Sequence, residues 1–242
     1  MQKETKKTTG GEGSPLVFSI FGARPQFVKA YAVGRALARA GGVREFRVHS
    51  GQHYDRMMSQ VFLEEFGLGE PDVNIGAGSG THAAQTGGIM RAVEELLMEH
   101  RPALAIVYGD TNTTLAAALA AAKLNIPVAH VEAGMRCGDM RVPEEVNRVV
   151  TDRVSSLLFC PAEDAARNLA REGMTAGVEV TGDVMVETFH MFTPAAAKRS
   201  AVLEEHGLRA GEYILLTVHR AENTDDAARL AAVFEGCADA GL

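Results

Sequence analysis

Acidic side chains recur in the segment 107–148, where each follows a feature that ends an apolar run or begins a helix. Asp110 follows LAIVYG, Glu132 follows IPVAHV, and Glu144 follows the proline of RVPEEVNR. In an open α/β sheet, ligands bind in the crevice outside the carboxyl ends of the parallel strands. Carboxylates placed there are candidates for general acid and base catalysis. The segment therefore predicts an enzyme.

Each acid also has a structural interpretation. Asp110 precedes the helical pattern TNTTLAAALAAAK and could serve as its N-cap, and Glu144 could favour a helix dipole from the first turn. Glu132 is harder to explain in this way, because a carboxylate directly after PVAHV is expensive to bury without a purpose. The three acids together favour a reactive site over a set of helix caps.

Further candidates follow other apolar runs. The turn GARPQFVK places Arg24 and Lys29 at the start of a predicted helix, whose free amides would suit a phosphate or carboxylate. Solvated side chains are the alternative. Neither GxGxxG nor GxxxxGK[ST] is present, so dinucleotide or P-loop binding has little support. Gln52 and His53 follow a second run, and His219 ends the run YILLTVH near the end of the chain.

Short apolar runs alternate with helical patterns from residue 16 onward, which is typical of βαβ units around a parallel sheet. The runs predict strands at 16–22, 45–51, 103–109, 127–133, 156–161 and 177–182. The helical patterns lie at 25–41, 55–67, 81–100, 112–125, 144–155 and 163–173. The sequence thus predicts an α/β fold with a doubly wound, Rossmann-like domain.

The predicted domain organisation has four parts. Residues 1–15 read as a disordered leader and 16–183 as the N-terminal Rossmann-like domain. Residues 184–210 are a linking helix with a possible interruption at Pro194, and 211–242 begin a second α/β domain with a strand and a helix. We expect this second domain to be incomplete, because one strand and one helix cannot close a core.

Composition narrows the class of protein. The net charge of −7 and the isoelectric point near 5.6 argue against nucleic acid or a membrane surface as a partner. The sequence has no apolar run of about 18 residues, so it predicts no membrane span. The three cysteines are far apart, and neither CxxC nor HExxH occurs, so we expect no disulfide, no metal site and a cytoplasmic location.

The motifs, taken in order, resemble one family. GARPQFVK, SGQHYDRM, YGDTNTTLAAALAA, HVEAGMRCGD, PEEVNR, VTGD and LTVHRAEN are together similar to the bacterial and archaeal UDP-N-acetylglucosamine 2-epimerases. The resemblance implies a GT-B-like two-domain fold, a homodimer, and reversible conversion of UDP-N-acetylglucosamine to UDP-N-acetylmannosamine for polysaccharide biosynthesis. It implies a UDP-sugar substrate and no cofactor.

The resemblance also implies roles for individual residues. The catalytic residues would be Asp110, Glu132, Glu144 and His219. The substrate-binding residues would be Arg24, Lys29, Gln52, His53 and Arg148, the last as part of an outer layer around the acids. The chain ends at Leu242, before the serine- and glycine-rich loop that holds uridine in this family, so we expect residues 1–242 alone to bind a UDP-sugar poorly.

Three alternatives remain at this point. A GT-B glycosyltransferase would share the architecture but would need an acceptor, and a hydrolysing epimerase would release UDP and the free sugar. A non-catalytic UDP-sugar-binding module or a truncated product would need none of the acids. The sugar could also be a 2,3-diacetamido uronic acid derivative.

Overall fold

A computed structural model describes residues 13–51, 69–218 and 221–239. The chain divides into two compact units, Met1–Met191 and Phe192–Leu242, which we describe separately. The predicted leader up to residue 12 and the predicted helix 55–67 lie outside the described residues. No helix in the described ranges is both long and apolar enough to cross a membrane.

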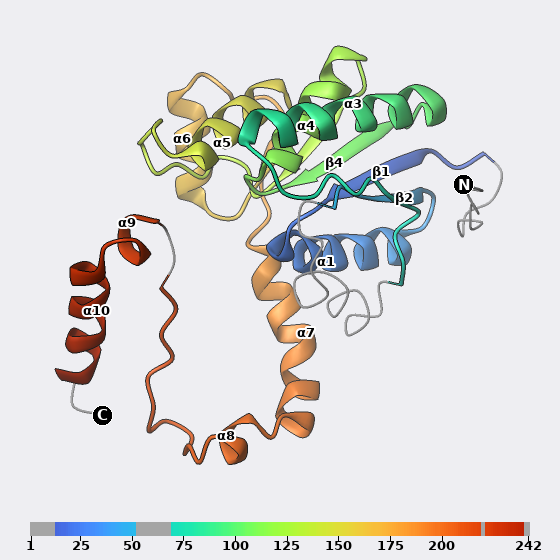
Figure 1. Cartoon of the computed structure of the whole chain (residues 1–242). Coiled ribbons are helices and arrows are strands. Elements are labelled where there is room, and N and C mark those ends of the chain that lie inside the picture. Colours follow the sequence, from blue (N-terminus) through green and yellow to red (C-terminus); the bar gives the residue numbers. More distant parts are fainter. Residues whose placement is uncertain (1–12, 52–68, 219–220, 240–242) are drawn as a thin grey trace. The chain divides into compact units, whose positions relative to one another are not determined.

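The first unit is built on a parallel sheet whose strand order is β3-β2-β1-β4-β5-β6-β7 (Figure 1). Every recorded pairing between these neighbours is parallel. All six predicted strands are confirmed, and the two-residue strand β3 was not predicted. The strands are β1 (Leu16–Phe21), β2 (Arg44–His49), β3 (Val73–Asn74), β4 (Leu104–Tyr108), β5 (Val128–Val131), β6 (Leu157–Cys160) and β7 (Val178–Val180).

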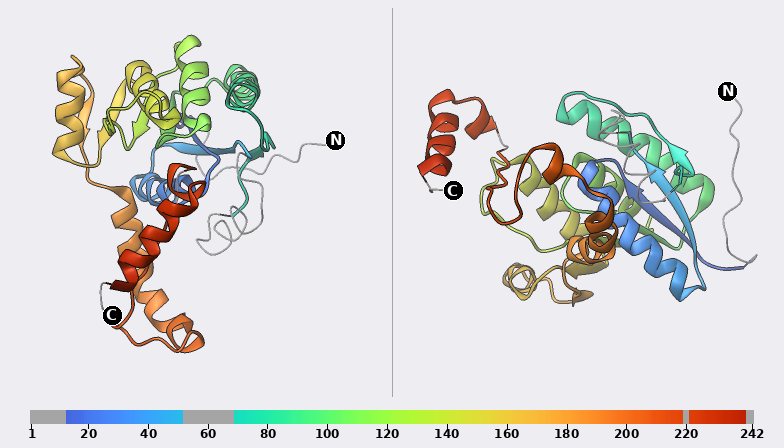
Figure 2. Two further views of the ribbon diagram at one scale, coloured as in Figure 1. Left: turned by 60° about the vertical axis from the view of Figure 1, so that its left-hand side comes forward. Right: turned by 90° about the horizontal axis from the view of Figure 1, so that it is seen from below.

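Helices cover both faces of this sheet. The two further views in Figure 2 agree with Figure 1 in placing α1 on one face and α3 with α4 on the other. The helices of this unit begin and end close to the predicted positions. They are α1 (Arg24–Ala40), α3 (His82–His100), α4 (Asn112–Lys123), α5 (Pro143–Val154) and α6 (Glu163–Arg171). The doubly wound fold class is therefore confirmed.

Alternation along β1 explains why both faces are covered. Phe18 and Ile20 belong to the core cluster with α3 and α4, whereas Val17 and Phe21 pack with Phe27 of α1. Successive side chains of a strand point to opposite faces, so a strand with apolar side chains on both faces needs a cover on each side. Burying both faces fixes the register of β1, and with it the position of the turn that follows.

The second unit departs from the prediction. Helix α7 (Val184–Arg199) begins in the first unit and continues through Pro194, where an interruption was predicted as possible; it is followed by α8 (Val202–Glu205), α9 (Ala221–Thr224) and α10 (Ala227–Asp239). The strand predicted after residue 211 is wrong for the described part of that segment, 211–218. Ile214 is 43% exposed and Leu215 84% exposed.

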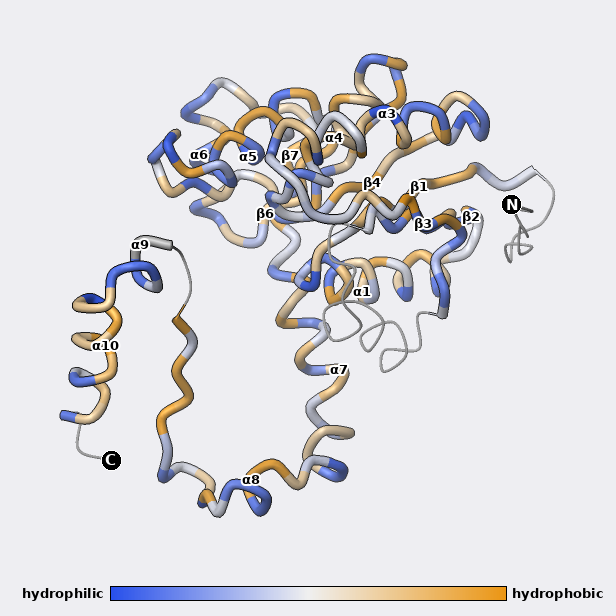
Figure 3. The backbone as a smooth tube through the Cα atoms, in the orientation of Figure 1, coloured by the Kyte–Doolittle hydropathy of each residue, from blue (hydrophilic) through white to orange (hydrophobic). Residues whose placement is uncertain are grey.

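The absence of this strand has a physical reason. A strand needs a neighbouring strand to receive its main-chain hydrogen bonds, and the described residues of the second unit contain no other strand. Figure 3 shows the segment before α9 as predominantly apolar despite its exposure. Apolar character alone therefore does not produce a strand here. The predicted end of the N-terminal domain at residue 183 stays a prediction.

Candidate active site

Strands β1 and β4 are parallel neighbours at the centre of the sheet. From β1 the chain continues to β2 and β3 on one side, and from β4 to β5, β6 and β7 on the other, so the strand order reverses between β1 and β4. Open α/β sheets bind ligands at this point, outside the carboxyl ends of the strands. The turns after β1, β4 and β5 meet there. They bring Lys29 of α1, Asp110 and Glu132 to the carboxyl ends of the strands, which we call the sheet edge below. Asp110 follows β4 and Glu132 follows β5, so these two predicted acids lie on neighbouring turns.

Lys29 and Glu132 form an ion pair at this edge. The side chain of Lys29 is 8% exposed and that of Glu132 is 28% exposed, so the pair opens to solvent on the side of the acid. A mostly buried ammonium group needs an anionic partner, which Glu132 supplies. The predicted acid thus keeps access to a ligand while its charge is balanced from within the protein.

Glu132 has an unusual backbone. Its φ of 75° lies in the left-handed region, which non-glycine residues seldom adopt. Its amide donates to the carbonyl of Phe159 at 3.1 Å, and the amide of Ala133 donates to the same oxygen at 3.0 Å. The neighbouring strand therefore holds the strained turn. Such strain persists only where the surroundings enforce it, and it is concentrated at functional sites.

Gly109 separates β4 from Asp110 and lies against the ion pair. A Cβ atom at this position would be 3.2 Å from both Glu132 Oε2 and Lys29 Nζ, and the φ of Gly109 is +61°. Its amide donates to the carbonyl of Val131 at 2.9 Å. The turns that carry Asp110 and Glu132 are thus joined directly, and only a residue without a side chain allows this approach.

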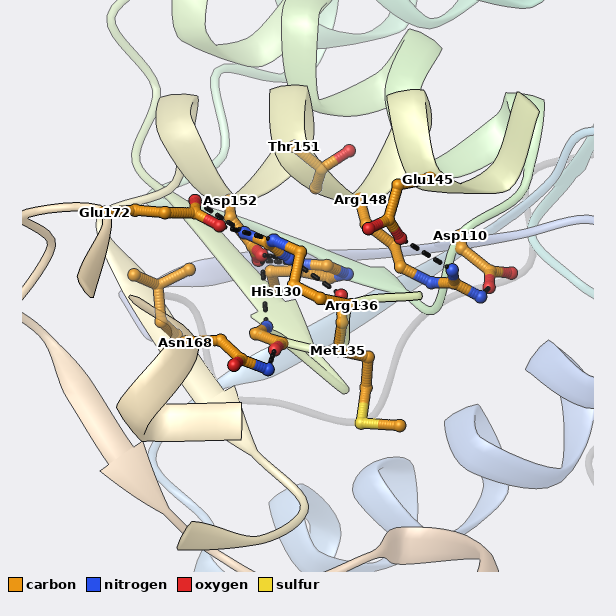
Figure 4. Close-up of polar contacts among 12 residues, drawn as sticks. Asp110, His130, Met135, Arg136, Glu145, Arg148, Thr151, Asp152, Asn168 and Glu172 are labelled. Carbon is orange, nitrogen blue, oxygen red and sulfur yellow. Dashed lines mark hydrogen bonds and ion pairs between the residues drawn. The ribbon is translucent and has the colours of Figure 1, made fainter. Parts of the chain in front are cut away.

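Asp110 belongs to a second charged cluster. Its carboxylate pairs with Arg148 of α5, and Arg148 Nη1 also donates to Glu145 Oε2 at 3.0 Å (Figure 4). Asn147 donates to the carbonyl of Asp110 at 2.8 Å. The N-cap of α4 is Thr111, whose hydroxyl accepts from the amide of Thr114. The alternative role of Asp110 as a cap is therefore wrong, and its carboxylate pairs with Arg148 instead.

The two glutamates of PEEVNR have different surroundings. Glu145 is buried, and it accepts from the amides of Cys137 at 3.0 Å and Gly138 at 2.8 Å. Burial acts to raise the pKa of Glu145, but these amides and Arg148 outweigh it and hold the pKa below its ordinary value. Glu145 thus fastens the loop before α5 as an ionised carboxylate.

Glu144 is exposed in the first turn of α5 and has no hydrogen bond or ion pair with any residue that the structure describes. Its position fits the alternative role at the helix dipole as well as a role toward a ligand. The catalytic role predicted for Glu144 therefore stays a prediction.

Gln26 is a structural residue of the site that the sequence did not single out. Its Oε1 accepts from the amides of Gly22 and Ala23 at 2.8 and 2.9 Å, and its Nε2 donates to the carbonyl of Tyr108 at 2.6 Å. The same Nε2 donates to the hydroxyl of Thr114 at 2.9 Å. This buried amide joins the start of α1 to the end of β4.

The capping by Gln26 corrects one expectation. The start of this helix was predicted to offer free amides to an anion. Gln26 occupies the amides of Gly22 and Ala23, its own main-chain amide donates to the carbonyl of Ala23, and Pro25 has no amide hydrogen. Anion binding at this end of α1 would fall to side chains. Arg24 is exposed at the first residue of α1, at the same helix end as Lys29.

Three predicted site residues, Gln52, His53 and His219, lie outside the described residues. The structure therefore does not test them. Within the described ranges, no group of three or more histidine, cysteine, aspartate or glutamate side chains is arranged to hold a metal ion. Of the cysteines, Cys160 is buried in the core and Cys137 is exposed in the loop that Glu145 fastens.

A series of ion pairs lies next to the turns of the two acids, and it was not predicted from the sequence. His130 of β5 contacts Asp152 of α5, Asp152 contacts Arg136, and Arg136 contacts Glu172 at the end of α6 (Figure 4). The position of His130 inside the apolar run PVAHV was the available signal, since a fully buried histidine needs polar partners. Its partners come from distant segments and were not legible in the sequence.

The arrangement combines acids that can transfer protons with cations that can stabilise departing negative charge. Asp110 forms an ion pair with Arg148, and Glu132 forms one with Lys29. Ionised carboxylates accept protons, and a carboxylate beside a cation on an open edge can return one to a bound ligand. Such an edge suits chemistry at a polar, anionic substrate.

Comparison with known proteins identifies relatives of this chain. The family model described as UDP-N-acetylglucosamine 2-epimerase matches residues 35–240. UDP-2,3-diacetamido-2,3-dideoxy-D-glucuronate 2-epimerase of Pseudomonas aeruginosa is 43% identical over 222 residues, which are 90% of this chain and 61% of that protein. UDP-N-acetylglucosamine 2-epimerase of Methanocaldococcus jannaschii is 42% identical over 226 residues, which cover 90% of this chain and 60% of the relative.

Solved structures agree with these relatives. The crystal structure of the Methanocaldococcus jannaschii UDP-GlcNAc 2-epimerase in complex with UDP-GlcNAc and UDP superposes with a TM-score of 0.84 at 42% identity, and the match covers 91% of this chain and 61% of that chain. The chain thus spans about 60% of the length of these relatives. On the extent of the matched family model, the chain belongs to the UDP-N-acetylglucosamine 2-epimerase family.

Proposed function

We propose that the protein interconverts UDP-N-acetylglucosamine and its C-2 epimer, UDP-N-acetylmannosamine. The observation that carries this proposal is the placement of Asp110 and Glu132 on neighbouring turns, each bonded to a cation, at the edge where the strand order reverses. A relative that is 42% identical carries the name of this activity, and its crystal structure contains UDP-GlcNAc and UDP.

The substrate explains why two acids and nearby cations are needed. The C-2 hydrogen of an N-acetylhexosamine has no adjacent carbonyl to acidify it, so removing and returning that proton alone is a poor route. Elimination avoids the difficulty: a base takes the C-2 proton, the C-1–oxygen bond breaks, and UDP leaves with the bonding electrons. The product is a 2-acetamidoglucal. UDP then adds back to C-1 while a proton is delivered to the opposite face of C-2, which leaves no net oxidation or reduction.

The residues divide between these tasks. Asp110 and Glu132 exchange the C-2 proton, and we assign no order to them. Lys29 and Arg148 balance the charge of these acids and stabilise the departing diphosphate, with Arg24 as a further contact at the start of α1. His219, Gln52 and His53 remain predicted to complete the site around the sugar.

The proposal is tested by replacing each acid with its amide in the protein at its full natural length. General acid–base catalysis contributes about 10²- to 10⁴-fold, so Asp110→Asn and Glu132→Gln should each lower kcat by about that factor. Glu163→Gln on α6 is the matched control and should retain full activity. Retained epimer formation in both acid variants would contradict the proposed site.

The same assay decides the role of Glu144. If Glu144 acts only on the dipole of α5, Glu144→Gln should keep nearly all activity and lose well under 1 kcal/mol of stability. If it touches the sugar, kcat should fall with no change in stability. Release of UDP with transfer of the sugar to an acceptor, rather than epimer formation, would favour a glycosyltransferase.

The name of one relative suggests a second substrate to test. The Pseudomonas aeruginosa relative, at 43% identity, is named for UDP-2,3-diacetamido-2,3-dideoxy-D-glucuronate. Both nucleotide sugars should therefore be offered to the same preparation, and the ratio of their kcat/KM values identifies the sugar. We further propose a cytoplasmic homodimer, and sedimentation velocity of the protein at its full natural length tests its subunit number.

A further inference from the structure

His130 is fully buried in β5, two residues before Glu132, and both of its ring nitrogens have oxygen partners. Nδ1 lies 2.6 Å from Asp152 Oδ1 (Figure 4), and Nε2 lies 2.7 Å from the carbonyl oxygen of Gly109. The protonation state of the ring therefore follows from what these two oxygens can do.

The carbonyl of Gly109 can only accept, so Nε2 must carry a hydrogen. Asp152 Oδ2 accepts from Arg136 Nη1 at 2.7 Å and from the amide of Gly134 at 3.1 Å, which leaves Oδ1 for His130. Burial acts to raise the pKa of Asp152, but the hydrogen bonds and charges of His130 and Arg136 outweigh it and lower the pKa. An ionised Asp152 requires a hydrogen on Nδ1 as well.

The surrounding charges balance an imidazolium at this position. His130 faces Asp152 on α5, Asp152 faces Arg136 in the loop after β5, and Arg136 bonds Glu172 at 2.7 and 2.9 Å. Positive and negative groups thus alternate from the sheet to the end of α6. Buried charges are tolerated when they are paired and hydrogen-bonded in this manner.

The His130–Asp152 pair contacts both the turn of Asp110 and the turn of Glu132. Through Nε2, His130 holds the carbonyl of Gly109, which belongs to the same peptide unit as the amide of Asp110. Through Asp152, it reaches the amide of Gly134, two residues after the left-handed Glu132. The two acids therefore share one rigid support behind the sheet edge.

We propose that His130, with a hydrogen on each ring nitrogen and anchored by Asp152, is a positioning residue whose Nε2 bond to the carbonyl of Gly109 fixes the turn of Asp110 against the turn of Glu132. Its kinetic consequence rests on the proposed function. A positioning role follows from geometry because small displacements of catalytic groups cost large factors in rate: about 1 Å can cost 100-fold.

Two amide variants separate the contacts of His130. In His130→Gln the side-chain amide nitrogen reaches the place of Nε2 and keeps the bond to Gly109. In His130→Asn it lies near the place of Nδ1 and keeps the bond to Asp152. Both variants lose the imidazolium, so their losses of stability should be similar.

The rates should differ. We expect His130→Gln to keep most of its kcat and His130→Asn to lose roughly 10- to 100-fold, by analogy with other outer-layer supports, with KM for the UDP-sugar unchanged in both. A merely structural role predicts that kcat follows stability in both variants. Equal kcat values, or an effect confined to KM, would overturn the positioning role.

Two further measurements need no turnover. NMR of the imidazole nitrogens should show a hydrogen on each ring nitrogen of His130, and a single neutral tautomer would overturn the ion pair. Crystal structures of the two variants should show the Asp110 turn displaced in His130→Asn only. Unchanged turns in both would overturn the positioning role. Failure of the wild-type protein to form the epimer would count against the proposed function alone.

Discussion

Replacing Gly109 with alanine should damage catalysis far more than stability. Gly109 has a φ of +61°, and an added Cβ would lie 3.2 Å from Glu132 Oε2 and from Lys29 Nζ. Ordinary van der Waals contact begins at 3.4 Å, so each neighbour must move by a few tenths of an ångström. Both are ends of long side chains and can move, but the ion pair then leaves its place at the sheet edge.

The cost to stability is set mainly by the backbone. A non-glycine residue in the left-handed region costs about 1–2 kcal/mol. Gly173 has a φ of +79° and nothing within 4 Å of the added atom, so Gly173→Ala isolates this backbone term. We expect the free energy of unfolding to fall by about 1–2 kcal/mol in both variants.

Activity should separate the two variants. Since a displacement of about 1 Å can cost 100-fold, a shift of a few tenths predicts a loss of roughly tenfold in kcat for Gly109→Ala. Gly173→Ala should keep the rate of the wild-type protein. The measurements are urea denaturation and the initial rate of epimer formation. Equal rates in the two variants would refute the inference that Gly109 protects the position of the ion pair.

Two more predictions concern stability. Gly22→Ala would place a Cβ 1.8 Å from Ser50 Oγ and should lower the free energy of unfolding, measured in urea, by about 1–3 kcal/mol. The control Gly88→Ala, in α3 with nothing within 4 Å of the added atom, should be neutral or stabilising. Equal effects of the two substitutions would contradict the predicted crowding at Gly22. Burial raises the pKa of Glu45, so folding favours its protonated form, and stability is lost as the pH rises from the ordinary value of 4.5 through the raised one. Glu45→Gln should therefore stabilise the protein at neutral pH and lose that advantage in acid, and exposed Glu99→Gln should do neither.

The strands of the first unit could be predicted because each is a short apolar run between turn residues, and burial on both faces leaves a strong signal. Strand β3 is only two residues long, Val73–Asn74, and gave no such signal. The segment 211–218 gave the signal without forming a strand, because pairing depends on a neighbour that sequence patterns do not reveal.

The site divides in the same way. Asp110 and Glu132 could be predicted, since the carboxyl end of a parallel strand is a position defined along the chain. Gln26, His130 and Asp152 could not, because their roles arise from contacts between segments that are distant in sequence. The acids could be predicted from the sequence pattern, whereas the residues that position them can be identified only in the folded structure.

The central claim is that the acids at the edge of β4 and β5 exchange the C-2 proton of a UDP-sugar. The most direct test is NMR of UDP-N-acetylglucosamine in D2O with the protein at its full natural length, beside its Glu132→Gln variant. The account predicts UDP-N-acetylmannosamine carrying deuterium at C-2 with the wild-type protein, and both epimer formation and exchange slowed by about 10²- to 10⁴-fold in the variant. An epimer that retains its original hydrogen, or undiminished exchange by the variant, would contradict it.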